Sequence, residues 1–120
     1  MNTLHNRTFG SEGEDRAAAF LEDRRFTIIA RNFRFGKYGE IDIIARKDDL
    51  VVFAEVKHRG TERYGGALYS IGPRKKKSLR TAARSFIAAS PDYDRPEITF
   101  RFDLISIQDG RIEWIEDMFR

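Results

Sequence analysis

The sequence predicts a single α/β domain with the order helix, three strands, helix and further strands. The chain has 120 residues, and its content of 41% hydrophobic and 12% aromatic residues is enough for one core. Apolar residues recur at helical spacing in two segments, and strand-forming residues dominate most of the others. We therefore expect one domain over residues 1–120, with a flexible N-terminus over about 1–10.

The first helix is expected over about 11–25. It begins with Ser11-Glu12-Gly13-Glu14, a pattern typical of a capping box, and continues with an apolar stripe that contains Ala17, Ala18 and Leu21. Glu14 has two interpretations, because it can close the capping box and also lies on the stripe that should face the sheet. A carboxylate that enters a core needs a partner, so Glu14 is either a cap or a ligand of a cation.

Strands are expected in the segments rich in β-branched and aromatic residues, and a second helix is expected between them. Pro73 suits the first position of that helix, and Asp109-Gly110 is the most specific turn signal in the chain. The expected strands are 27–35, 38–46, 50–58, 97–107 and 111–116, the second helix is 73–89, and 59–72 is a loop.

The hairpin between the second and third strands carries the strongest functional signal. Asp48-Asp49 is typical of a turn, and a hairpin folded symmetrically about it sets Asp42 opposite Glu55 and Glu40 opposite Lys57. These four charged residues then share one strand face. A loop of four residues keeps this register, whereas a loop of three would shift it. The other face would be wholly apolar and contain Ile41, Ile43, Ala45, Val52, Ala54 and Val56.

Asp42 and Glu55 are close enough in this register to bind one divalent cation, because opposed Cβ atoms lie about 5 Å apart. A cross-strand ion pair is the alternative explanation, and it fits Glu40 with Lys57 but not two facing carboxylates. The chain has no cysteine, and its two histidines are far apart in sequence. The expected ion is therefore one that prefers oxygen ligands, Mg²⁺ or Mn²⁺.

Positive charge is concentrated in residues 58–84, which hold eight Lys or Arg and one acid and so carry +7, whereas the whole chain carries +3. This segment follows Glu55-Val56-Lys57 directly, as expected for a site that receives a polyanion. Residues 74–77 are all cationic and open the second helix, where the helix dipole disfavours positive charge unless phosphate offsets it. A solvated helix face is the alternative. The apolar face of this helix contains Leu79, Ala82, Ala83, Phe86 and Ile87.

No apolar run reaches membrane-spanning length, and residues 1–10 lack the hydrophobic stretch of a secretory signal. We therefore expect a cytoplasmic protein with no membrane partner.

A series of short motifs runs along the chain: Glu14-x-x-Ala17-x-x-Phe20-Leu21, Arg31-Asn32, Gly39-Glu40-Ile41-Asp42, Phe53-x-Glu55-Val56-Lys57-x-Arg59, Tyr64-Gly65, Pro73-Arg74-Lys75 and Arg101-Phe102-Asp103. In this order the motifs resemble the YraN-type family of uncharacterised bacterial proteins, and the match covers nearly the whole chain. That family is similar to the PD-(D/E)XK nuclease superfamily and to Holliday-junction resolvases. The resemblance implies a restriction-endonuclease-like α/β fold, in which a mixed central sheet is flanked by helices.

The resemblance also implies a metal-dependent nuclease that hydrolyses phosphodiester bonds. It does not name a substrate; we expect DNA, and RNA is left open. Carried over residue by residue, Asp42, Glu55 and Lys57 are the catalytic set. The implied metal ligands are Glu14, Asp42, Glu55 and the carbonyl of Val56. Lys57 would either orient the attacking water or stabilise the charged transition state.

Nucleic acid is expected to contact cationic side chains, and one of them departs from the family, which commonly has Gln where this chain has Lys76. A non-catalytic nucleic-acid-binding module on the same fold is the alternative function, and a homodimer is left open. The expected nucleic-acid contacts are Arg34, Lys37, Arg59, Arg74, Lys76, Lys77 and Arg80.

Overall fold

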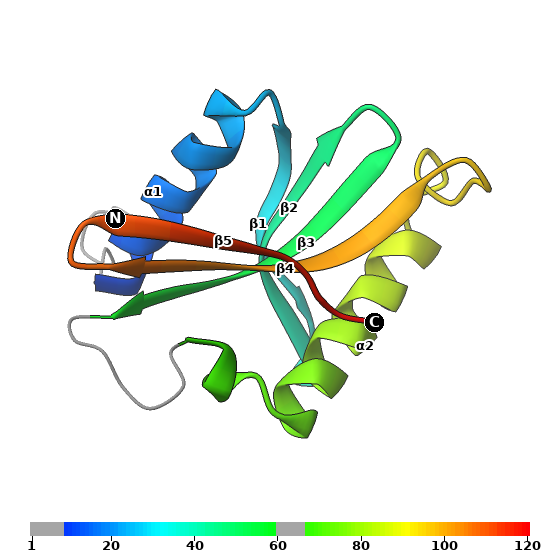
Figure 1. Ribbon diagram of the computed structural model, residues 1–120. Helices are drawn as coiled ribbons and strands as arrows, with labels where there is room; N and C mark the ends of the chain where they lie inside the picture. The colour runs from blue at the N-terminus through cyan, green and yellow to red at the C-terminus, as the bar shows by residue number, and fades with distance from the viewer. Residues whose placement is uncertain (1–8, 60–66) are drawn as a thin grey trace, which may run out of the picture.

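The computed structural model describes residues 9–59 and 67–120, and in it two helices cover opposite faces of a five-stranded sheet (Figure 1). The strands lie in the order β1-β2-β3-β4-β5, and all neighbours are antiparallel except β3 and β4, which are parallel and are connected through α2. The sheet is therefore mixed and flanked by helices, as expected, and the α/β arrangement is consistent with a restriction-endonuclease-like domain. The elements are α1 (Phe9–Asp23), β1 (Thr27–Phe35), β2 (Gly39–Lys47), β3 (Leu50–Arg59), the short 3₁₀ helix η2 (Ala67–Ser70), α2 (Pro73–Ala88), β4 (Thr99–Gln108) and β5 (Arg111–Phe119).

The turn at Asp48-Asp49 sets the register of β2 and β3. Lys47 pairs with Leu50, and the pairing continues in step to Ile43 with Ala54, which confirms the predicted register over this part of the hairpin. Asp48 has a φ of 54°, in the left-handed region that aspartate tolerates better than most residues, and this conformation permits a turn of two residues.

The two faces of the sheet bury different sets of apolar side chains. Ile43, Ala45, Val52 and Ala54 pack beneath α1, as the alternation predicts. The prediction that Ile41 shares this face is wrong, because Ile41 belongs to the cluster that packs against α2. The alternation therefore breaks between Ile41 and Ile43, next to the point on β1 where Asn32 has a φ of 53°.

Helix α2 packs with the face that its sequence predicts. Leu79, Ala82, Ala83 and Phe86 are buried there, and Ile87 is partly buried. Gly39, the first residue of β2, lies directly against this helix, because a Cβ atom built on it would come within 2.5 Å of the backbone oxygen of Ser78. Only glycine allows this close approach, which fixes the start of β2 on α2.

Strands β4 and β5 are held together by the fully buried carboxylate of Asp103. It accepts two hydrogen bonds from Arg101, one from the indole N–H of Trp114 and one from the backbone N–H of Asp117, each 2.8 Å long. The hydrogen bonds join both sides of an irregularity in the β4–β5 register between Phe102 and Leu104. The expected boundaries move slightly here, with β4 beginning at Thr99 and β5 ending at Phe119.

The start of α1 differs from the expectation. The helix begins at Phe9, so Ser11 lies inside it and cannot be its N-cap, because a capping residue stands outside the helical backbone. The capping-box role of Glu14 is therefore wrong. Residues 1–8, which form most of the expected flexible N-terminus, and residues 60–66 of the expected loop lie outside the described residues. Within the described ranges, no helix is long and apolar enough to cross a membrane.

The Asp103 network yields a prediction about stability. Asp103→Ala should lower the free energy of unfolding by about 3–5 kcal/mol, because it leaves the mostly buried Arg101 cation and two further donors without an acceptor. Urea denaturation followed by circular dichroism measures the change. Glu116→Ala is the matched control, since Glu116 also pairs with Arg101 but is half exposed, and its loss should cost less than about 1 kcal/mol. Equal costs for the two variants would contradict this account.

Candidate active site

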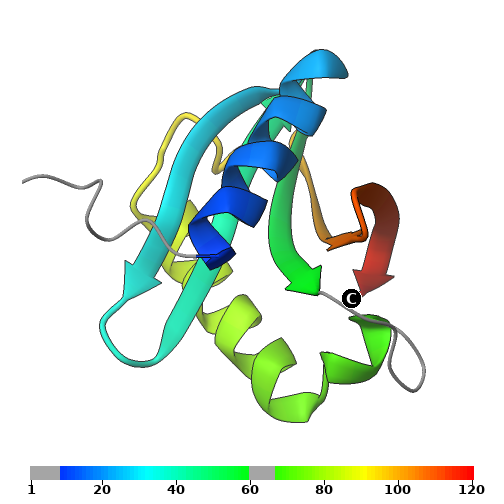
Figure 2. The same cartoon turned by 90° about the vertical axis from the view of Figure 1, so that its left-hand side faces the viewer.

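The site begins where the pairing of β2 and β3 ends. The last pair is Ile43 with Ala54, and beyond it the backbone N–H of Val56 donates to Oδ2 of Asp42 at 2.8 Å. The Asp42 carboxylate thus accepts the hydrogen bond that a backbone oxygen of β2 would accept in a regular pairing. The two strands diverge from this point, and the gap faces the first turns of both helices (Figure 2).

A pocket of about 360 Å³ lies at this divergence. It draws side chains from four elements, which are α1, β2, β3 and α2. The structure therefore brings together the predicted catalytic and metal-binding residues, which come from three of these elements. The lining residues are Glu14, Glu40, Asp42, Glu55, Val56, Lys57, His58 and Lys75.

Glu55 is the most buried acid of the pocket, with only 6% of its side chain exposed, and it forms ion pairs with two lysines. Its Oε2 atom lies 3.3 Å from Nζ of Lys57 and 3.2 Å from Nζ of Lys75. Glu40 does not pair with Lys57 as the cross-strand alternative predicted. Its carboxylate lies 3.4 Å from Arg34, which is directly opposed to it on β1, whereas the β2–β3 pairing has already ended at Ile43.

The acidic side chains of the pocket lie close enough to disfavour one another's ionised form. Burial, and secondly the nearby charge of Glu55, raise the pKa of Asp42 to about 7, although the hydrogen bond from Val56 acts in the opposite direction. Burial also raises the pKa of Glu14, against the hydrogen bond from Asn32 and the charge of Arg31, which lower it. The pocket is therefore a place where bound positive charge would relieve an unfavourable interaction.

The donor set suits a hard divalent cation. Asp42 uses one oxygen for Val56 and the lysines share one oxygen of Glu55, so each carboxylate has a second oxygen to offer. Over the described ranges, no three acidic, histidine or cysteine side chains are positioned to hold a metal ion by themselves. An ion here would need the Val56 carbonyl or water as further ligands, and Mg²⁺ commonly keeps several waters.

Gly13 positions α1 over the pocket. A Cβ atom built on Gly13 would lie 2.7 Å from Cβ of His58, so the helix can approach the end of β3 only because this residue has no side chain. Glu14 follows immediately and lines the pocket, where Arg31 lies 3.8 Å from its carboxylate. The close packing of α1 on β3 thus brings a carboxylate to the site.

Three lining residues, Glu40, His58 and Lys75, are absent from the predicted site set, and Lys75 is the one that contacts the predicted catalytic residue Glu55. This lysine stands one helical turn before the buried Leu79, so the same periodicity that predicts the apolar face of α2 also directs Lys75 towards the sheet. The first turn of α2 has Gly72 as its N-cap, no side-chain cap and no acid.

The other predicted nucleic-acid contacts fall into separate groups. Arg74 and Lys77 are exposed on α2. Lys76 and Arg80 instead lie over the ring of Phe119, at 5.7 and 4.9 Å from its centre, and Arg80 also donates to the backbone oxygen of Arg120. Arg34 and Lys37 lie on the β1–β2 hairpin, and Arg59 is in β3, with its side chain outside the described residues.

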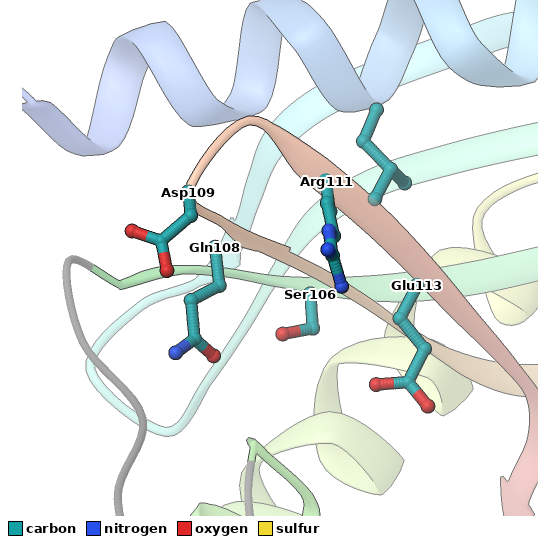
Figure 3. A pocket seen from close by; sticks show the side chains of 6 residues that line it. Ser106, Gln108, Asp109, Arg111 and Glu113 are labelled. Atoms are coloured by element: carbon teal, nitrogen blue, oxygen red, sulfur yellow. The ribbon is translucent and has the colours of Figure 1, made fainter.

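A larger pocket of about 620 Å³ lies beside this site, on the β4–β5 hairpin, where Ser106, Gln108 and Glu113 point to the same side (Figure 3). Ser106 is the β4 neighbour of Lys57, so the two pockets are adjacent. The side chains of the larger pocket come from one hairpin and mix Asp109 and Glu113 with Arg111. Its carboxylates belong to a single hairpin and no lysine joins them, so the smaller pocket, where acids and lysines converge from four elements, is the candidate site.

Comparison with known proteins gives consistent matches. A family model described as "Uncharacterised protein family UPF0102" matches residues 13–107, a range that includes every residue of the smaller pocket. A UPF0102 protein of Nitrosomonas europaea is 41% identical over 113 residues, which is 92% of each chain. A UPF0102 protein of Nitrosomonas eutropha is 42% identical over 120 residues, covering 99% of this chain and 97% of the relative. One from Ralstonia pickettii is 42% identical over 114 residues, covering 92% and 88%.

The raised pKa of Asp42 predicts an unusual dependence of stability on pH. Between its ordinary value near 4 and the folded value of about 7, the folded protein binds this proton more tightly than the unfolded chain does. The free energy of unfolding, measured by urea titration with EDTA present, should therefore fall as the pH rises from 5 to 8. Asp42→Asn should flatten this fall and be more stable than wild type at pH 8 by at least about 1 kcal/mol. The exposed Asp49→Asn serves as control, and a wild-type slope retained in Asp42→Asn would refute the prediction.

The contact between Gly13 and His58 predicts a coupled pair of substitutions. Gly13→Ala should destabilise the fold by about 1–3 kcal/mol, because the added methyl group overlaps Cβ of His58. In a His58→Gly background the same substitution should cost far less, since the overlapping atoms are gone. A double-mutant cycle of unfolding free energies measures this coupling, and additive effects would show that the contact does not limit the approach of α1.

Proposed function

We propose that this chain, which belongs to the uncharacterised protein family UPF0102, is a metal-dependent nuclease that hydrolyses phosphodiester bonds, with DNA as the first choice of substrate. Membership of this family confirms the expected YraN-type family alone, and the family description names no activity. The proposal is carried by one observation. Asp42, Glu55 and Lys57 converge where β2 and β3 diverge, and α1 adds Glu14 to the same pocket.

The carboxylates favour catalysis over simple phosphate binding. A site that only held phosphate would be hindered by Glu14, Asp42 and Glu55, because like charges repel. A divalent cation resolves this conflict. Asp42, Glu55 and the Val56 carbonyl are the groups that would hold Mg²⁺ or Mn²⁺ together with water, and Glu14 lies in the same pocket. When bound, the ion would supply Lewis acidity towards the phosphodiester and acidify a water molecule.

Lys57 and Lys75 supply the positive charge that belongs to the protein itself. Both contact Glu55, one from β3 and one from α2, so the buried carboxylate remains paired before any ligand arrives. Lys57 would place its ammonium group where the phosphoryl oxygens gain negative charge, and in its neutral form it would orient the attacking water. Lys75 would hold Glu55 in position from the opposite side.

The outer surface of α2 supports an approach by a polyanion. The helix carries six Lys or Arg and no acid, and Arg74 and Lys77 are exposed near its first turn. Cationic side chains and the helix N-terminus both favour phosphate at this end. Lys76 and Arg80, which pack on Phe119, would contribute less than their sequence position suggests.

A non-catalytic nucleic-acid-binding module is the second candidate. It is favoured by the pairing of Glu55 with two lysines, because this pairing already neutralises the most buried acid of the pocket without a metal ion. In the nuclease Lys57 would be needed for cleavage. In the binding module, which does not cleave, Lys57 would only balance the charge of Glu55.

Lys57→Ala separates these functions. With Mg²⁺ or Mn²⁺ and a panel of single-stranded, duplex, flapped, nicked and four-way substrates, cleavage by the variant should fall by on the order of a hundredfold or more. Nucleic-acid affinity should be largely kept, because the exposed cations of α2 remain. Lys47→Ala, at the other end of β2, is the matched control.

Circular dichroism of each variant establishes that it is folded. Cleavage by folded Lys57→Ala at the wild-type rate would reject the mechanism. Wild-type protein that binds the substrates but cuts none of them would support the binding module instead. Calorimetric titration with Mn²⁺ tests metal binding separately. Equal binding by wild type and by the Asp42→Asn, Glu55→Gln double variant would contradict the proposed metal site.

A further inference from the structure

Two exposed aromatic rings stand together on the turn between β1 and β2. Phe35 is 46% exposed and Tyr38 is 65% exposed, and among the described residues only Leu68 joins them as an exposed large hydrophobic side chain. Their ring centres are 6.2 Å apart, with an angle of 46° between the planes. We call these two residues the aromatic tip.

The turn that carries the aromatic tip has a defined conformation. The backbone N–H of Tyr38 donates to the backbone oxygen of Phe35 at 3.0 Å, and Gly36 adopts a φ of 55°. In Figure 2 this turn forms a corner of the molecule next to α2. The hydrogen-bonded turn therefore holds both rings at the surface.

Several cationic side chains lie near the aromatic tip, one of them, Arg34, paired with Glu40. Phe35 borders a shallow hollow on α2 together with Arg84, and Lys37 lies 6.0 Å from the ring centre of Tyr38. Arg34 precedes the tip, and α2 contains no acid along its whole length. A second copy of this chain seated on the same surface would bring like charges together, whereas a nucleic-acid strand would meet the cations with its phosphates.

The aromatic tip is connected to the candidate active site through the first residues of β2. Gly39 follows Tyr38 and packs against the backbone of α2, and the next residue, Glu40, lines the pocket. Arg34, beside the tip, pairs with that same Glu40. A strand of nucleic acid held at the pocket could therefore reach the tip along the start of β2.

Resting on the proposed function, we infer that Phe35 and Tyr38 stack on unpaired bases of a nucleic acid whose phosphates lie along α2. Aromatic side chains stack on bases of any sequence, because every base has a π face, but the bases inside a continuous duplex are already stacked on one another. The protein would therefore prefer single-stranded or flapped nucleic acid over uninterrupted duplex.

Fluorescence anisotropy with EDTA present tests this preference without cleavage. The probes are a labelled 20-nucleotide single strand, the matched duplex, and the duplex with a single-stranded flap. In the Phe35→Ala, Tyr38→Ala variant, affinity for the single strand and the flap should fall by about tenfold or more, and affinity for the duplex by less than about twofold. Tyr38→Phe keeps a ring and should bind like wild type.

The remaining outcomes distinguish the stacking role from the proposed function and from a contact between two copies of the chain. Unchanged single-strand affinity, or an equal loss for all three probes, would overturn the stacking role while leaving the proposed nuclease intact. Wild-type protein that binds none of the probes would contradict the proposed function and this inference together. A wild-type dimer in light scattering that the alanine variant converts to a monomer would show that a second copy covers the tip. If the double variant fails to fold, Tyr38→Ala alone replaces it, because this side chain is largely exposed.

Discussion

The hydrogen bond from Val56 to Asp42 is the interaction on which the candidate site depends. It ends the regular pairing of β2 and β3, because the Asp42 carboxylate accepts the hydrogen bond that the backbone of β2 would otherwise accept from Val56. The strands can then diverge, and the divergence opens the pocket. The same bond holds Asp42 near Glu55, where burial and charge disfavour the ionised form. Buried acids that disfavour their own ionisation are common at functional sites, which is why this point of the sheet is the candidate site.

Two glycines set how closely the helices approach this arrangement. Gly13 lets α1 contact the end of β3, and Gly39 lets β2 lie on the backbone of α2. Each helix then contributes one charged residue to the pocket, Glu14 from α1 and Lys75 from α2. The pocket is thus built from both layers that cover the sheet, and its charge balance depends on both contacts being formed.

Much of the fold could be predicted because its signals are local. β1 has the predicted boundaries, and the turn at Asp48-Asp49 determined the β2–β3 register through short-range geometry. The failures involve interactions that sequence spacing does not encode. Ile41 changes faces where the alternation breaks, and Lys57 pairs with Glu55 whereas Glu40 pairs with Arg34 of β1. The Asp103 network joins residues from both sides of a register irregularity, which no periodic pattern reveals.

The parallel pairing of β3 with β4 has a consequence for the order of folding. β1, β2 and β3 are joined by short turns, and such hairpins close in about 1–10 μs, whereas β3 and β4 can pair only after the chain has passed through α2. Asp42, Glu55 and Lys57 all belong to the part with local contacts, whereas Lys75 can reach Glu55 only when α2 packs on the sheet. Lys75 then adds a second cation to Glu55 as the sheet closes, so the completed fold gives the most buried acid of the pocket two ion pairs.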